Sequence, residues 1–208
     1  MNGSVDGAWP VPFRFGGRLC LDFVNTVNSR SRPATRDYLP DWAALAGWCR
    51  QTALFEADVM ARLEKTGLHD GEGATAAHRE AVAFREALYG LFKALIDNEA
   101  VPGVSLSALN ESLRAARDRQ VLADAGRRFD WRWDASRLDL AAPVHAVALS
   151  ASAMLSQDDL GRLKECPGPD GCGWLFFDET RNGSRRWCSM DHCGGAAKAR
   201  RYAARHAG

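Results

Sequence analysis

Four cysteines lie within 28 residues near the C-terminal end of the chain and constrain its fold more than any other feature. Cys166 and Cys172 have five residues between them, a gap of fifteen follows, and Cys188 and Cys193 have four between them. Two close pairs at this separation are typical of structural zinc sites. Zinc takes four ligands at tetrahedral corners, and four cysteines leave no open position for a substrate. The spacing therefore predicts one structural zinc ion per chain, bound by these four residues.

Two other uses of these cysteines remain open from the residues alone. His192 follows Cys188 after three residues and could replace one thiolate in a Cys₃His site. Two disulfides would suit an exported chain, but the opening MNGSVDGAWPVPFRFGG lacks the basic start and apolar segment of an export signal. The other two cysteines, Cys20 and Cys49, stand singly among apolar residues, which is typical of small buried side chains.

The residues between and after the cysteine pairs predict a small folded module. CPGPDGC is rich in proline and glycine, which allow a tight reversal. Residues 174–177 and 185–188 flank a polar connection that contains Asn182-Gly183, a strong turn dipeptide, and this pattern predicts a zinc-clamped hairpin. GGAAKARRYAARHAG lacks proline and is rich in alanine and arginine, so we expect a helix over about 196–205.

Positive charge gathers in the same module. The whole chain carries 27 Lys and Arg against 26 Asp and Glu, but residues 166–208 carry 7 against 4. At helical spacing Lys198, Arg201 and Arg205 share one face, with Tyr202 beside them. Such a row suits phosphate contacts, and it is equally compatible with a solvated surface helix. The basic residues that we take as candidate nucleic-acid contacts are Arg185, Arg186, Lys198, Arg201 and Arg205.

The upstream part of the chain predicts a helical domain. With 208 residues and 46% hydrophobic residues, the chain can form one substantial core and a small appended module. No apolar run is long enough to span a membrane, so we expect a cytoplasmic protein without a membrane partner. Helical patterns cover 42–54 after a possible N-cap at Asp41, 56–67 with an end at Gly67, 74–99, 107–119 and 143–155. RRFDWRWDA predicts a short strand.

The segment LCLDFVNTV predicts a further short helix with a polar face. Leu19, Phe23 and Val27 recur every four residues, while Asp22, Asn25 and Thr26 gather opposite them. These polar side chains suit either binding of a small effector or hydrogen bonding inside the domain, and we favour the second role. Elsewhere His78 and His145 stand without any pattern that names a nucleophile or a second base, so we expect no enzyme activity.

The stretch CPGPDGCGWLFFDETRNGSRRWCSMDHCGGAAKARRYAAR resembles the CGNR-type zinc finger, a bacterial C-terminal module. Upstream, GGRLCLDFVNTVNSR resembles the opening of the ABATE domain, the usual partner of that finger and described as a stress-induced transcription regulator. The resemblance implies the same four cysteine ligands. The eponymous Cys-Gly-Asn-Arg reads Cys193-Gly194-Gly195-Ala196 here, so the asparagine and arginine side chains are missing while the thiolates remain.

Together these observations predict a mainly α protein with two parts. Residues 1–163 form an ABATE-like helical domain with minor strands, and residues 164–208 form a zinc-bound hairpin and helix. We expect a DNA-binding transcription regulator, whose larger domain senses a small-molecule effector or mediates association into a homo-oligomer. The alternative is a structural or protein-interaction module without DNA binding, in which four aromatic residues of the finger pack against the helical domain or a partner: Trp174, Phe176, Trp187 and Tyr202.

Overall fold

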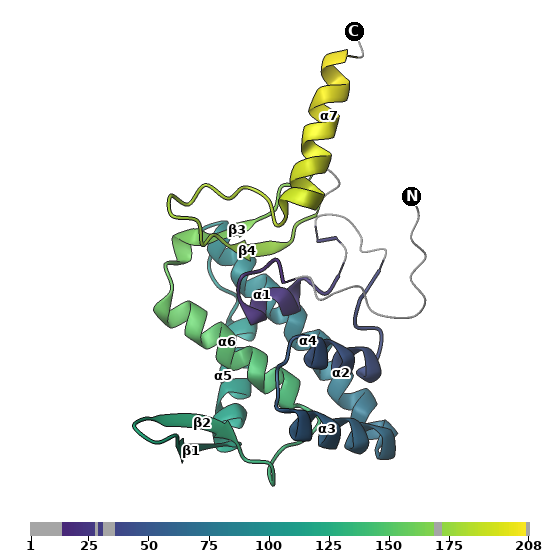
Figure 1. The fold of residues 1–208 in the computed structure, drawn as a ribbon, viewed down its shortest axis with the longest axis vertical. Coiled ribbons are helices and arrows are strands. Elements are labelled where there is room, and N and C mark those ends of the chain that lie inside the picture. The colour runs from purple at the N-terminus through teal and green to yellow at the C-terminus, as the bar shows by residue number, and fades with distance from the viewer. Residues whose placement is uncertain (1–13, 28, 31–35, 169–171, 207–208) are drawn as a thin grey trace.

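The computed structural model describes residues 14–27, 29–30, 36–168 and 172–206. Over these ranges the protein is mainly helical, as predicted (Figure 1). The α-helices are α1 (Leu19–Val24), α2 (Trp42–Gln51), α3 (Ala57–His69), α4 (Gly71–Ile96), α5 (Gly103–Asp118), α6 (Ala142–Gln157) and α7 (Gly195–His206). The strands β1 (Gln120–Asp124) and β2 (Phe129–Trp133) form one antiparallel pair, and β3 (Leu163–Glu165) and β4 (Leu175–Phe177) form another. A 3₁₀ turn (Leu160–Arg162) precedes β3, and a π-helical turn (Met190–Gly194) precedes α7.

The long helix α4 contributes most to the core of the helical part. Its buried face includes Leu88, Leu91 and Phe92, and Phe84 joins it one turn earlier. Helices α1, α2, α3, α5 and α6 all contact α4, so one apolar core forms between them. Full burial of side chains of this size stabilises the fold by about 1.5–3 kcal/mol each.

The boundary between α3 and α4 differs from the prediction. Helix α3 continues past Gly67 to His69, and Asp70 then caps α4 by accepting a hydrogen bond from Gly73 N at 2.8 Å. A Cβ on Gly67 would lie 2.2 Å from Trp42 Nε1. Gly67 is therefore required for close packing of the indole and does not end the helix. The predicted N-cap at Asp41 is confirmed, since its carboxylate accepts a hydrogen bond from Ala44 N at 2.8 Å.

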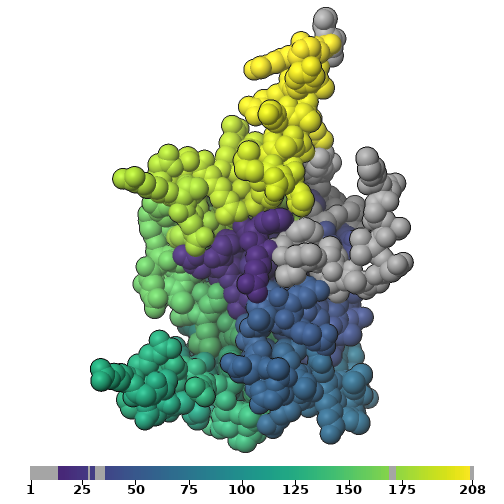
Figure 2. Space-filling view, viewed as in Figure 1, coloured from purple at the N-terminus to yellow at the C-terminus, as the bar shows by residue number. Residues whose placement is uncertain are grey.

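The predicted strand in RRFDWRWDA is present as β2, but it has a partner that the sequence did not reveal. Strand β1 follows α5 directly and pairs with β2 in a hairpin. The hairpin projects from the side of the molecule, at the lower left in Figures 1 and 2. Trp133 at the base of the hairpin packs against the helical core, where its ring meets that of Phe55 edge-on at 5.7 Å.

The hairpin predicted between 174–177 and 185–188 is wrong. Strand β4 pairs with β3, upstream of the first cysteine pair, and residues 185–188 form no strand. The reason is that the backbone bonds of the β3–β4 pair continue to the first cysteine pair: Cys166 N donates to Trp174 O at 2.8 Å, and Gly173 N donates to Cys166 O at 3.2 Å. The expected domain boundary between residues 163 and 164 falls inside β3.

The turn at Asn182-Gly183 exists, but it encloses a buried carboxylate instead of joining two strands. Gly183 has φ +62° and donates its N–H to Thr180 O at 3.1 Å. Asp178 is fully buried and accepts hydrogen bonds from Lys164 Nζ (2.7 Å), Thr180 N (3.0 Å) and Arg185 N (2.8 Å). Burial alone would raise the pKa of Asp178, but the hydrogen bonds from Lys164 and Thr180 hold it well below its usual range.

The finger is joined to the helical part through α1. Asn25 donates its side-chain N–H to Leu175 O at 2.8 Å and accepts from Leu175 N at 2.9 Å, so its amide pairs with β4 as a neighbouring strand would. Trp174 Nε1 donates to Val27 O at 2.5 Å, and Phe177 N donates to Gly16 O at 2.7 Å. The finger and the helical part therefore share one continuous set of buried contacts.

The other polar side chains of α1 and the residues after it are also used inside the protein. Asp22 accepts a hydrogen bond from Gly16 N at 2.8 Å, and burial raises the pKa of its carboxyl to about 7. Thr26 donates to Phe23 O at 2.7 Å and accepts from Arg85 at 3.2 Å. The favoured structural role of this polar face is confirmed.

Among the described helices, none has the length and apolar character needed to cross a membrane.

We predict that Asn25→Ala destabilises the whole protein. The substitution leaves both the N–H and the C=O of Leu175 buried without partners, which should cost about 2–4 kcal/mol. Denaturant unfolding of the zinc-loaded protein would measure this loss. The matched control is Asn110→Ala on the exposed face of α5, which should change stability by less than about 0.5 kcal/mol. Equal effects of the two substitutions would contradict the proposed link.

Candidate metal centre

The four cysteines that the sequence singled out converge in the structure. All four Sγ atoms lie within 4.8 Å of one another. The distance from Cys172 Sγ to Cys188 Sγ is 3.7 Å, and that from Cys188 Sγ to Cys193 Sγ is 3.6 Å. A tetrahedron with zinc–sulfur bonds of about 2.3 Å requires sulfur atoms about 3.8 Å apart. The thiols therefore fit one zinc ion, and they are too far apart to be disulfides, whose sulfur–sulfur bond is about 2.05 Å.

Each cysteine reaches the cluster from a different piece of local structure. Cys166 follows β3, Cys172 lies shortly before β4, Cys188 follows the irregular segment and Cys193 lies in the π-helical turn before α7. Gly168 is buried inside the loop, where a Cβ would lie 2.4 Å from Cys172 Cβ. The glycine that the sequence suggested as a turn residue is thus required for two chain segments to approach closely.

The Cys₃His alternative is not supported by the geometry. The cluster among the described residues consists of four cysteines, and His192 is exposed with its ring edge-on to Phe15 at 5.6 Å. Cys20 and Cys49 are fully buried in the helical core, as expected. Burial raises the pKa of both thiols, that of Cys20 to about 12, so neither is a reactive thiolate.

The thiols of the cluster interact so closely that they do not ionise equally. Hydrogen bonds from Cys172 and Cys188 lower the pKa of Cys166 to about 2, so one sulfur is readily ionised. The same hydrogen bonds to Cys166 raise the pKa of Cys172 and of Cys188, and burial raises that of Cys193. A bound Zn²⁺ compensates the repulsion between thiolates and permits all four to ionise, which is the chemistry that a structural ion supplies.

Arg185 supports the cluster from outside. Its guanidinium donates to the backbone carbonyls of Cys188 (2.5 Å), Phe15 (2.7 Å) and Trp187 (3.0 Å). The same group lies 4.5 Å from the ring centre of Phe176. These contacts fix the backbone of Cys188, one of the zinc ligands. They also use the guanidinium N–H groups that a phosphate would need. The sequence placed Arg185 among the DNA contacts, but its position fits a structural role.

The other four candidate contacts lie on the surface. Arg186 is exposed and covers the ring of Trp187 at 5.2 Å. Lys198, Arg201 and Arg205 are exposed on α7, which buries no residue of its own. Figure 1 shows α7 extending away from the rest of the molecule, and Figure 2 shows its side chains standing clear of the body. The structure therefore presents a basic helix immediately after the last cysteine.

The helix start explains the unusual sequence after Cys193. Ser189 caps the π-helical turn by accepting a hydrogen bond from His192 N at 3.3 Å. A Cβ on Gly194 would lie 2.9 Å from Met190 Sδ, so this position requires glycine or a local shift. A Cβ on Gly195 would make only an ordinary contact, at 3.5 Å from Met190 O. The chain can thus accommodate an asparagine at this position although it has none.

These features define a zinc finger attached to a helical domain. They are four sulfur atoms at tetrahedral distances, a hairpin that ends at the first cysteine pair, and an exposed helix after the last cysteine. The sequence profile of the CGNR zinc finger matches residues 162–206, which contain all four cysteines. The profile of ABATE, described as "Putative stress-induced transcription regulator", matches residues 17–158, more than half of the chain. The chain belongs to the ABATE family and carries one structural zinc ion in a C-terminal CGNR finger. A search of curated proteins finds no match.

We predict that zinc content depends on the clustered cysteines alone. Elemental analysis of the purified protein should find about one zinc per chain, and Cys166→Ser or Cys188→Ser should reduce it because the closed site loses a ligand. Cys49→Ala is the matched control, since it removes a buried thiol outside the cluster and should leave the zinc content unchanged. Full zinc occupancy in Cys166→Ser would contradict the ligand assignment.

Proposed function

We propose that the protein is a zinc-dependent DNA-binding transcription regulator, with α7 as the principal DNA contact. The observation that carries the proposal is a helix of twelve residues that buries none of them and exposes Lys198, Arg201 and Arg205 on one face. None of these three forms an ion pair with another described residue. Basic side chains held in a row release counterions when they bind phosphates, and this release favours association with DNA.

The zinc ion links the fold of the finger to the basic face of α7. Cys193 lies in the turn that leads into α7, so the ion holds the first turn of the helix against the finger. Short helices without a packed face are marginal in water. The ion therefore sets the direction in which the basic face points, and its loss should weaken DNA binding as well as the fold. A helix of this length spans about 18 Å, and the major groove admits an α-helix.

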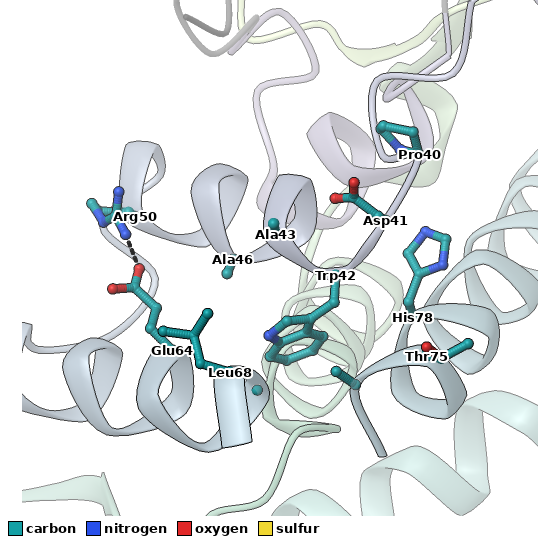
Figure 3. A pocket seen from close by; sticks show the side chains of 12 residues that line it. Pro40, Asp41, Trp42, Ala43, Ala46, Arg50, Glu64, Leu68, Thr75 and His78 are labelled. Atoms are coloured by element: carbon teal, nitrogen blue, oxygen red, sulfur yellow. Dashed lines mark hydrogen bonds and ion pairs between the residues drawn. The ribbon is translucent and has the colours of Figure 1, made fainter. Parts of the chain in front are cut away.

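The helical domain has a cavity suited to a small effector. A cavity of about 550 Å³ lies between α2, α3 and the start of α4 (Figure 3). Trp42 occupies its centre and exposed Leu68 borders it, while the Arg50–Glu64 ion pair lies at one end and His78 at the other. Apolar walls with a few polar groups at the margins are typical of small-molecule sites. We infer that this cavity serves the sensing role.

We also propose that the protein binds and does not catalyse. His78 Nε2 donates to Leu39 O at 2.8 Å, which uses the proton-bearing nitrogen for structure. His145 is buried, and burial lowers its pKa. Neither histidine lies in the metal cluster.

A regulator of transcription acts where the DNA is, which for a bacterial module supports a cytoplasmic location.

The alternative of a purely structural finger is favoured by a specific observation. Trp174 and Phe176 are buried between the finger and the helical part, as that alternative requires. Tyr202 on α7 is 66% exposed and stacks only on His206 among the described aromatic contacts, at 4.1 Å between ring centres. A clamp explains the two buried rings but gives no reason for an exposed basic helix beyond the cluster. DNA binding accounts for the exposed basic helix, and the two buried rings are compatible with either role.

We predict that Arg201→Glu/Arg205→Glu weakens DNA binding at least about tenfold at moderate salt. Two phosphate contacts are lost, so the slope of log affinity against log salt should decrease by about 1.8. Titration of a labelled duplex at several salt concentrations would measure both quantities. Unbiased selection from random DNA with the zinc-loaded protein would then identify the preferred site.

The matched control is the double reversal Arg79→Glu/Arg114→Glu, which makes the same charge change on exposed faces of α4 and α5. We expect little effect on affinity beyond general screening. If zinc-loaded wild-type protein binds no DNA even at low salt, the structural alternative gains and the DNA role is lost.

A second prediction concerns the departure from the family pattern. Gly195→Asn/Ala196→Arg restores the eponymous residues at positions where a side chain fits, since Ala196 is exposed and a Cβ on Gly195 makes no close contact. The added guanidinium should tighten DNA binding several-fold and steepen the salt slope by about 0.9. Gly195→Asn alone is the control and should leave the slope unchanged. An unchanged slope in the double variant would place this end of α7 away from phosphate.

A further inference from the structure

The β1–β2 hairpin is a second exposed feature, distinct from the finger. It projects away from the body, at the opposite end of the molecule from α7 in Figure 1. Leu122, Phe129 and Trp131 are 56%, 65% and 54% exposed on it. A two-stranded ribbon is marginally stable by itself, and an edge strand with large exposed side chains is a template for pairing with another chain.

The hydrogen bonds of the hairpin show which backbone groups of β2 are already used. Asp134 N donates to Arg119 O at 2.8 Å, and Ala125 N donates to Arg128 O at 2.9 Å. Bonded pairs alternate along an antiparallel ladder. The even-numbered residues from 128 to 134 therefore direct their backbone groups toward β1.

The odd-numbered residues of β2 direct theirs away from β1. These are Phe129, Trp131 and Trp133, and no described backbone group bonds to their N–H or C=O on the outer side. Three consecutive pairs of donors and acceptors thus line one free strand edge. In an antiparallel pairing, two copies of this edge satisfy each other whenever odd-numbered residues of one copy lie opposite odd-numbered residues of the other.

We propose that β2 of one copy pairs with β2 of a second copy about a two-fold axis at Trp131, which joins the two hairpins into a four-stranded sheet. The stretch from 128 to 134, RFDWRWD, is complementary in charge to its own reverse. In this register Asp130 lies opposite the partner's Arg132, and Arg128 lies opposite the partner's Asp134. Symmetry repeats both pairs, and directly opposed opposite charges stabilise a sheet.

The neighbouring registers are excluded by the same charges. The smallest shift that keeps the outward groups facing each other moves the axis to Asp130 or to Arg132. The first places Asp130 opposite its own copy and Arg128 opposite Arg132. The second places Arg132 opposite its own copy and Asp130 opposite Asp134. Like charges directly opposite are destabilising, so the sequence selects the register centred on Trp131.

Existing contacts of these side chains are local: one carboxylate oxygen of Asp134 accepts hydrogen bonds from Ser136 N at 2.9 Å and Ser136 Oγ at 2.6 Å. Arg132 forms no ion pair with another described residue, and Arg128 contacts Asp130 only in an exposed pair at 3.3 Å. On the opposite face, Phe129 would lie across from the partner's Trp133, and the two copies of Trp131 would face each other. Aromatic cross-strand pairs add to the stability of a sheet. Pairing therefore places the aromatic side chains of the two copies side by side and satisfies the free edge at once.

The test uses full-length zinc-loaded protein without DNA, so it is independent of the proposed DNA role. Sedimentation should show wild-type protein at twice the chain mass of 22.8 kDa. Asp130→Arg and Arg132→Asp each convert two attractive cross-strand pairs into two repulsive ones, and each should weaken dimerisation about tenfold or more. An equimolar mixture of the two variants should dimerise again, because Arg at 130 then meets Asp at 132 across the axis.

Glu111→Arg on the exposed face of α5 is the control and should remain dimeric. Circular dichroism of each variant checks that a monomer is still folded. Wild-type protein that stays monomeric at about 100 μM, where a dimer of micromolar affinity would be populated, overturns the proposal. Dimerisation of both single variants at wild-type strength, or a mixture that stays monomeric, overturns it as well.

Discussion

The convergence of four sulfur atoms on one ion is the constraint on which the rest of the C-terminal structure depends. Zinc demands ligands about 3.8 Å apart at tetrahedral corners, and the chain supplies them from the end of β3, the loop before β4, an irregular segment and the turn before α7. Meeting this demand closes the β3–β4 hairpin and sets where α7 starts. A helix that buries no residue is thereby held in a defined direction.

The hairpin that zinc closes also completes the helical part. Strand β4 presents Leu175 to Asn25, and the amide of Asn25 pairs with both backbone groups of that residue. Leu175 and Phe177 belong to the same apolar core as α4 and α6. Metal binding and the stability of the larger domain are therefore coupled through one short strand, because buried backbone groups need partners. The finger is a structural part of the domain as well as a carrier of α7.

Comparison of the chain with its structure shows where sequence patterns suffice. The cysteine spacing identified the metal cluster, and apolar periodicity identified α2, α4, α5 and α6, because both signals are local. The strand partner of β4 was wrong because the Asn182-Gly183 turn is a strong hairpin signal. The turn instead encloses Asp178, and a buried carboxylate four residues upstream leaves no signature in the pattern. Strand β1 was missed because a strand of only five residues, directly after a helix, carries little strand signal.

The sequence by itself determined the zinc ligands, the helical class of the protein, the basic helix after Cys193 and the charge pattern of RFDWRWD. These properties depend on residues close to one another along the chain. Only the tertiary structure decided that Arg185 binds backbone carbonyls and that Asn25 pairs with Leu175. It also decided which edge of β2 is free. The physical reason is that the partner of a polar side chain in the interior is chosen by packing between segments as far as 170 residues apart, and the local sequence pattern contains no record of that choice.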